Sequence, residues 1–277
     1  MKYSTALLTL VCAGQLAFSQ APAAPKPAPN LTPDLSKEPL QASFGLQDPS
    51  VLARQRQNKP VLGKAAPTPR LADGKPDLTG PWAPNAIREN VNLIGVGVEI
   101  PFKPEAKALY DSRLAKLGMD DPEARCLPPG VPRLNTTPYP FRFVQTPGMI
   151  AILYEGGSQT FRQIFTDGRK HSPQAEELWN GESIGHWEGD TLVVETIGFN
   201  ESTWIDAAGV PHSSGMKVTE RMTRLDTDNM EIINTVDDPK MYTKPWSFTT
   251  YPRRLNGELL EYICDENEKD VQHLKGK

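Results

Sequence analysis

This sequence has few cysteines, no long apolar run after its N-terminus and little excess of one charge over the other. Three cysteines in 277 residues exclude a small scaffold held together by several disulfides. No segment after the N-terminus approaches the ~20 apolar residues of a membrane-spanning helix, so no span is expected in the mature chain. The 30 Lys and Arg stand against 34 Asp and Glu, which excludes the basic face that nucleic acids require. Hydrophobic residues still make up 38%, enough for a core, so wholesale disorder is excluded.

The first 19 residues have the pattern of a secretory signal peptide. Lys2 precedes a short apolar run, and Ala17 and Ser19 are the small residues that a cleavage site needs. Cys12 raises a lipid anchor as the alternative, but the residue before it is not small, as such an anchor requires. The sequence therefore predicts cleavage near Ser19 and a periplasmic or secreted protein.

Cleavage at that point removes Cys12 and leaves an even pair, Cys126 and Cys264. Disulfides form and persist in oxidising compartments, so we expect these two cysteines to be bonded. Two buried thiols are the alternative.

Proline, at 27 residues, marks the divisions of the chain. Residues 20–40 form a Pro/Ala tract, and the whole of 20–70 is expected to be a weakly ordered linker or strap. Residues 71–267 carry the regular patterns and are expected to form one domain. Residues 268–277 form a charged tail.

One segment, from Pro104 to Gly118, has the features of a helix. Pro104 suits a first helical position and Gly118 a C-terminal stop. The apolar stripe predicted between them consists of Leu109, Tyr110, Leu114 and Leu117. The pattern predicts one amphipathic helix flanking the main fold.

From residue 141 onward, apolar and polar residues alternate as in half-buried strands. Turn residues divide this region into four successive hairpins: 149–154 with 160–165, 183–187 with 191–197, 216–225 with 230–236, and 246–251 with 259–264. Residues 78–82 and 143–145 are further candidate strands. Successive hairpins make antiparallel neighbours, so we expect a mostly β fold, an up-and-down barrel or else a sandwich.

Several strings in the same region are distinctive: DGKPDLTG at 73–80, FTDGR at 165–169, IGHWEGDTLVVETIGFN at 184–200 and EYICDEN at 261–267. Together they resemble a group of exported, largely uncharacterised bacterial proteins with lipocalin-like barrels. The resemblance covers roughly residues 71–267. It implies an exported β-barrel and implies no reaction.

Alternation also predicts which polar side chains share a face with apolar ones. Glu220, Glu261 and His186 each do so on their own strand. A carboxylate on an apolar face is costly, so it must be paired, protonated or beside a cavity. A histidine with Glu220 or Glu261 suits general acid–base catalysis. The alternative is pairing with arginines on nearby strands, namely Arg162, Arg221 and Arg224.

The four histidines show no local metal-binding spacing. Whether His171, His186 and His212 converge on a metal through the fold stays open. No nucleotide-binding motif occurs either, so we expect neither a metal nor an organic cofactor. Arg169, close to His171, is a candidate for contact with an anionic group of a ligand.

Aromatic residues lie in or beside the expected strands. Trp187, Trp204, Tyr242 and Trp246 are candidates for contact with an apolar or aromatic ligand in a barrel pocket. Packing in the core is the alternative.

Three functions follow from these features. The first is an exported protein that binds a small apolar or aromatic molecule in the barrel. The second is a cofactor-independent isomerase, hydratase or lyase that uses His186 with Glu220 or Glu261. The third is an interaction protein of the cell envelope whose barrel is packed solid. A cavity in the barrel separates the first two functions from the third.

Overall fold

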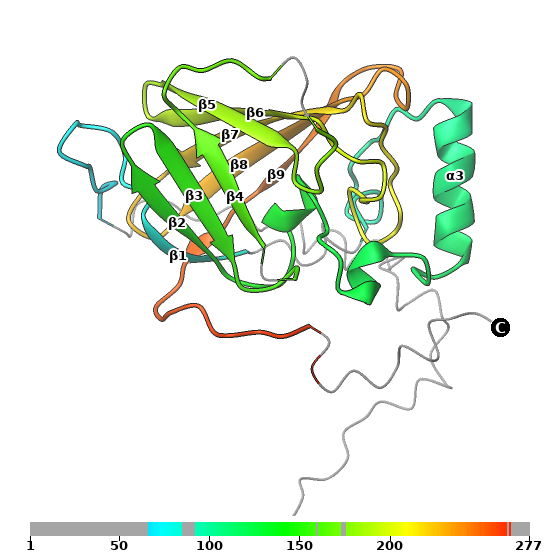
Figure 1. The fold of residues 1–277 in the computed structure, drawn as a ribbon, viewed down its shortest axis with the longest axis horizontal. Helices are drawn as coiled ribbons and strands as arrows, with labels where there is room; N and C mark the ends of the chain where they lie inside the picture. The colour runs from blue at the N-terminus through cyan, green and yellow to red at the C-terminus, as the bar shows by residue number, and fades with distance from the viewer. Residues whose placement is uncertain (1–65, 85–91, 159, 173–175, 265, 267–277) are drawn as a thin grey trace, which may run out of the picture. The chain divides into compact units, whose positions relative to one another are not determined.

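Ten strands form a single curled sheet, a half-barrel, with the order β10-β1-β2-β3-β4-β5-β6-β7-β8-β9 (Figure 1). Neighbours pair antiparallel, except that β4 and β5 run parallel. The strands are β1 Gly80–Ala83, β2 Phe141–Thr146, β3 Met149–Tyr154, β4 Phe161–Phe165, β5 Glu182–Glu188, β6 Thr191–Ile197, β7 Lys217–Arg224, β8 Met230–Asp237, β9 Trp246–Thr250 and β10 Arg253–Arg254. This mostly β, barrel-like sheet, accompanied by one α-helix among the described residues, confirms the fold class expected from the sequence.

This computed structural model describes residues 66–84, 92–158, 160–172, 176–264 and 266. The predicted signal peptide and charged tail, and residues 20–65 of the predicted linker, lie outside the described residues. All described residues belong to one compact unit, Pro39–Lys277. Within the described part, no helix is both long and apolar enough to cross a membrane.

Buried and half-buried residues alternate strictly along β7 and β8, so one face of the sheet lies in the core. In β8, Met230, Ile232 and Val236 are fully buried, and their neighbours along the strand are half-buried. The period of two in the sequence produces this pattern because successive strand residues point to opposite faces. The polar residues Glu220 and Asn234 occupy the same inner face, so charge enters the core along with the apolar side chains.

Three of the four expected hairpins are present, and the fourth is wrong. Residues 259–264 form no strand, and β9 pairs with β8 on one side only. Two residues after β9 the chain enters β10, which pairs with β1 at the other end of the strand order. The segment 259–264 has apolar residues at both odd and even positions, so its pattern does not predict which side of a strand would face the core. Leu260 is 72% exposed there.

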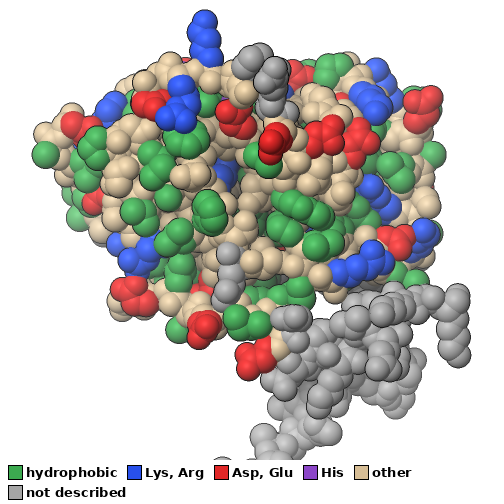
Figure 2. Space-filling view, in the orientation of Figure 1, with side chains coloured by type: hydrophobic (Ala, Val, Ile, Leu, Met, Phe, Trp, Pro, Cys, Tyr) green, Lys and Arg blue, Asp and Glu red, His purple; other side chains and the backbone are tan. Residues whose placement is uncertain are grey.

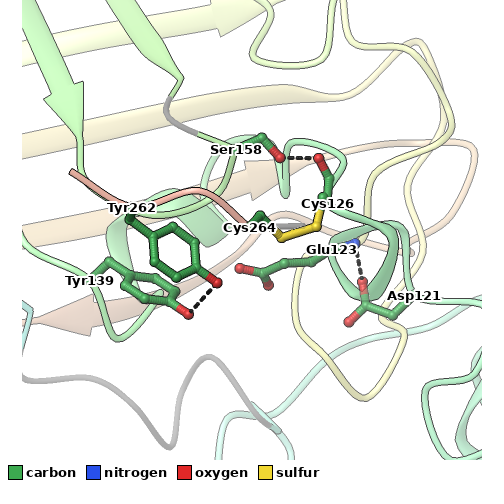
Figure 3. The surroundings of a disulfide bond; sticks show 7 residues. All are labelled: Asp121, Glu123, Cys126, Tyr139, Ser158, Tyr262 and Cys264. Carbon is green, nitrogen blue, oxygen red and sulfur yellow. Dashed lines mark hydrogen bonds between the residues drawn. A yellow bond between two sulfur atoms is a disulfide. The ribbon is translucent and has the colours of Figure 1, made fainter. Parts of the chain in front are cut away.

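Cys126 and Cys264 form a disulfide, with sulfur atoms 2.09 Å apart, as expected from the sequence (Figure 3). Cys126 follows the 3-10 helix η2 (Pro122–Arg125) and Cys264 lies beyond the last strand. The bond therefore ties the irregular C-terminal segment to a loop that precedes β2.

Helix α3 (Pro104–Ala115) lies where the sequence predicts it, and of the expected stripe Tyr110 and Leu114 face the core, whereas Leu109 and Leu117 are exposed. Ala106 and Tyr110, four residues apart, are buried, whereas Leu109 is 39% exposed. The Tyr110 ring stacks on Phe102, with ring centroids 5.4 Å apart. A spacing of four residues keeps side chains on one helical face, and Leu109 lies next to that face rather than on it.

Tyr110→Ala is expected to lower the free energy of unfolding by about 3–5 kcal/mol, because it removes a large buried side chain. Leu109→Ala, on the exposed side of the same helix, is the matched control and is expected to change it by less than about 1 kcal/mol. Urea unfolding followed by circular dichroism measures both variants. Equal losses would mean that Leu109 faces the core, as the sequence pattern predicted.

Candidate functional site

A buried ion pair crosses the interior of the sheet. The guanidinium of Arg162, on β4, contacts the carboxylate of Glu220, on β7, and the two side chains are 1% and 0% exposed. Arg162 Nη1 donates to Glu220 Oε1 at 3.0 Å, and Nη2 donates to Glu220 Oε2. Strands β5 and β6 separate β4 from β7 in the sheet, so the pair forms across the curl rather than between neighbouring strands.

Other buried polar groups complete this cluster. Arg162 Nε donates to Ser183 Oγ at 2.9 Å, and Nη2 donates to Thr196 Oγ1 at 2.7 Å. Asn135 Nδ2 donates to Glu220 Oε1 at 2.6 Å. Burial raises the pKa of Tyr154, which keeps its phenol protonated beside Arg162. Buried charges are tolerated when they are paired and hydrogen-bonded, as these are.

A pocket of about 330 Å³ opens where β4 and β5 begin. The two strands pair only through Ile164–Phe165 of β4 and Ser183–Ile184 of β5, so the residues at the start of each strand have no partner in the other strand. The pocket lining combines the apolar residues Phe161, Phe165, Leu178 and Trp179 with the polar residues Arg162 and Ser183. Arg162 and Ser183 belong both to the lining and to the buried cluster, so the pocket lies next to the cluster, although both residues are only 2% exposed. We call it the β4–β5 pocket.

The outer surface beside this pocket is apolar. Leu153 on β3 and Phe161 on β4 are direct partners in the sheet, and their residues are 40% and 60% exposed. Val144 on β2 and Leu178 are exposed as well. Figure 2 shows hydrophobic side chains distributed over this face of the molecule.

The predicted grouping of His186, Glu220 and Glu261 is not found. Ser183, Gly185 and Trp187 are on the inner side of β5, so His186 lies on the outer side, where its side chain is 65% exposed and 3.2 Å from Glu188 Oε1. Glu261 is exposed on the irregular C-terminal segment. Of the three residues, only Glu220 faces the interior.

The predicted ligand contacts Trp204, Tyr242 and Trp246 are buried in the core or against it, at most 5% exposed. The Tyr242 and Trp246 rings pack edge to face, with centroids 5.5 Å apart. Trp187 is partly buried, with Lys75 Nζ 5.3 Å from its ring centroid. None of these four lines the β4–β5 pocket. Their positions agree with the alternative to ligand contact, namely packing in or against the core.

Arg169 and His171 lie closer to the pocket. The Arg169 guanidinium is 3.8 Å from the ring centroid of Phe165, and His171 Nδ1 is 3.1 Å from Glu182 Oε2. Phe165 and Glu182 both line the pocket. Arg169 also pairs with Asp167 at 2.6 Å, so its charge is already balanced.

The histidines have separate partners. His212 is buried, with Nε2 2.6 Å from Thr203 Oγ1, and burial lowers its pKa, so the ring is neutral. No group of three or more His, Cys, Asp or Glu residues that could hold a metal ion occurs among the described residues.

Asp206 is another buried ionisable group. Its carboxylate accepts hydrogen bonds from the backbone nitrogens of Leu93, at 2.9 Å, and Val210, at 3.0 Å. Burial raises the pKa of Asp206 to about 6. The protonation state of this carboxyl group therefore changes the free energy of unfolding between mildly acidic and neutral pH.

Comparison with known proteins adds no relative. No family model, no curated protein and no solved structure matches the chain.

Glu220→Ala is expected to lower the free energy of unfolding by about 3–5 kcal/mol, because it leaves the Arg162 guanidinium buried without a counter-charge. The double variant Arg162→Met with Glu220→Leu removes both charges and is expected to recover most of that loss. Glu188→Gln, at an exposed ion pair with Arg221, is the control and should leave the urea midpoint unchanged. A Glu220→Ala midpoint equal to that of the control would contradict a tightly paired interior.

The contribution of Asp206 to stability is expected to be fully present below about pH 4 and lost as the pH rises through about 6. The sign follows because the folded state holds the proton that the unfolded chain has already released. A shift of about two units corresponds to about 3 kcal/mol. Asp206→Asn should flatten this part of the profile in urea unfolding between pH 4 and 7. A variant with the same slope as the wild type would exclude Asp206 as the source.

Proposed function

We propose that this protein binds a small apolar or aromatic molecule in the β4–β5 pocket. One observation carries the proposal: a largely apolar pocket of ligand size has in its lining Arg162, which a buried, hydrogen-bonded ion pair with Glu220 holds in place. Ligand sites typically combine mostly apolar walls with a few fixed polar groups, in volumes of roughly 300 Å³ or more.

The chemistry of the lining favours a neutral ligand. Phe161, Phe165 and Trp179 offer aromatic surface for a ring or a branched apolar group. The charge of Arg162 is balanced by Glu220, so a charged ligand gains little from it. The Ser183 hydroxyl supports orientation of a polar group of the ligand at the inner end.

Export is part of the proposal. The N-terminal pattern of residues 1–19 and the disulfide between Cys126 and Cys264 both support a periplasmic or secreted protein, because disulfides persist in oxidising compartments. An enzyme with a His/Glu pair is less well supported, because His186 lies on the outer face of β5 and Glu261 on the exposed C-terminal segment, whereas Glu220 faces the interior.

A second candidate function is an interaction protein of the envelope. The exposed pair Leu153 and Phe161, with Val144 nearby, favours it, because contiguous exposed apolar surface often marks a docking site. The core packing of Trp204, Tyr242 and Trp246 is also consistent with a barrel that holds no ligand in its centre.

Ligand binding is tested by titrating the protein with a library of lipophilic compounds and following tryptophan fluorescence. A ligand of the β4–β5 pocket is expected to change the emission of the wild type and to lose most of that effect in Trp179→Phe. Phe161→Ala is expected to weaken binding roughly tenfold to hundredfold in calorimetry, because a buried aromatic contact contributes about 1.5–3 kcal/mol.

Leu260→Ala, an exposed apolar residue outside the pocket, is the matched control and should bind like the wild type. A folded protein that responds to no compound would reject the pocket and favour the interaction function. An affinity unchanged in Phe161→Ala would place the ligand elsewhere.

A further inference from the structure

A second pocket, also about 330 Å³, lies beside the disulfide (Figure 3) and shares no lining residue with the β4–β5 pocket. Four separate parts of the chain line it. They are the turn and 3-10 helix around Glu123, the segment of Tyr139, the turn at Gly157 and Ser158, and the C-terminal segment with Tyr262 and Cys264. We call it the disulfide pocket.

Oxygen atoms gather on one side of this pocket. The Tyr139 hydroxyl donates to the Tyr262 hydroxyl at 3.2 Å, and Figure 3 shows the Glu123 carboxylate facing these hydroxyls. The hydrogen bond to Tyr262 raises the pKa of Tyr139 to about 12, so this phenol is neutral near pH 7. The pocket therefore presents two phenol oxygens and the Glu123 carboxylate, and Asp121 also belongs to its lining.

The charge beside the pocket is negative. Arg133 pairs with both Asp121, at 2.8 Å, and Glu123, at 2.6 Å, so these ion pairs set two carboxylates against one guanidinium. Asp121 and Glu123 line the pocket, whereas Arg133 is 2% exposed and does not. The Glu123 side chain is 20% exposed and that of Arg133 only 2%; burial raises the pKa of the Glu123 carboxyl group, and Arg133 opposes that shift.

We propose that the disulfide pocket binds the primary ammonium group of a small amine. An ammonium has three N–H donors and no acceptor, which matches the Glu123 carboxylate and the hydroxyl oxygens of Tyr139 and Tyr262. The carbon chain of the amine packs against Pro138, Ala124 and the disulfide, the apolar part of the lining. This site is independent of the β4–β5 pocket.

The disulfide holds one wall of this site. Tyr262 and Cys264 belong to residues 255–264, which form no strand and leave Leu260 and Ile263 exposed. Few buried apolar contacts mean low local stability, so the covalent bond and the contact of the Tyr262 ring with Tyr139, with centroids 4.9 Å apart, hold this wall. Without the bond, we expect Tyr262 to lose its fixed place opposite Glu123.

The test uses n-butylammonium and its neutral counterpart n-butanol, titrated into the full mature protein and followed by amide chemical shifts in ¹H–¹⁵N spectra. Saturable shifts are expected with n-butylammonium, centred on residues around Glu123, Tyr139 and Tyr262, and none there with n-butanol. Glu123→Gln should weaken this binding at least about tenfold, the usual worth of a hydrogen bond to a charged group.

Glu261→Gln removes the same charge next to Tyr262 but outside the pocket lining, and should bind like the wild type. Cys126→Ser with Cys264→Ser should abolish the saturable shifts while far-UV circular dichroism stays that of the wild type. Equal responses to the amine and the alcohol would overturn the proposal, as would equal losses in Glu123→Gln and Glu261→Gln. Binding that persists in the double serine variant would overturn the role of the disulfide. A ligand of the β4–β5 pocket shifts resonances of other residues, so either site can fail alone.

Discussion

The contact between Arg162 and Glu220 ties distant parts of the sheet together. Their strands, β4 and β7, are three places apart in the strand order, so the contact exists only because the sheet curls. Both groups are removed from water, and either one alone would be costly to bury. The curl, the pairing and the polar surroundings of Ser183 and Thr196 are therefore linked: a flatter sheet would separate the charges.

The same contact relates the fold to the candidate site. Arg162 is held in the interior by Glu220 and by its hydrogen bonds, and it is also one of the residues that line the β4–β5 pocket. A polar group fixed in this way gives a ligand a defined environment without adding net charge. One residue of the pocket lining is thus held by the core rather than by a surface loop.

Local patterns predicted most of the strands and the inward position of Glu220, because a period of two in the sequence is the period of a strand. They did not identify its partner. Arg162 was one of three candidate arginines, and only the curl of the sheet selects it. His186 shares a face with Ile184 as expected, but alternation defines two faces without stating which is inside. Small inner residues, Ser183 and Gly185, gave no apolar signal to decide the matter.

The pocket itself had no signal in the sequence. It depends on the parallel pairing of β4 with β5, which the link between residues 166 and 181 produces, and successive hairpins were the simpler expectation. Phe161, Leu178 and Trp179 stand in short segments with no motif, so their meeting follows from tertiary structure alone. The hairpin expected at 259–264 failed for a related reason: a cysteine, not a strand partner, fixes that segment.

The positions of Cys126 and Cys264 have a consequence for incomplete chains. Nine of the ten strands lie between them, so the bond closes only once the whole sheet-forming sequence has been made. A product truncated before residue 264 carries a lone thiol at Cys126 and no internal partner for it in the described sequence. In an oxidising compartment, the free thiol of such a fragment is prone to form disulfides with other molecules. In the complete chain, Cys126 is already bonded to Cys264 and has no free thiol to react.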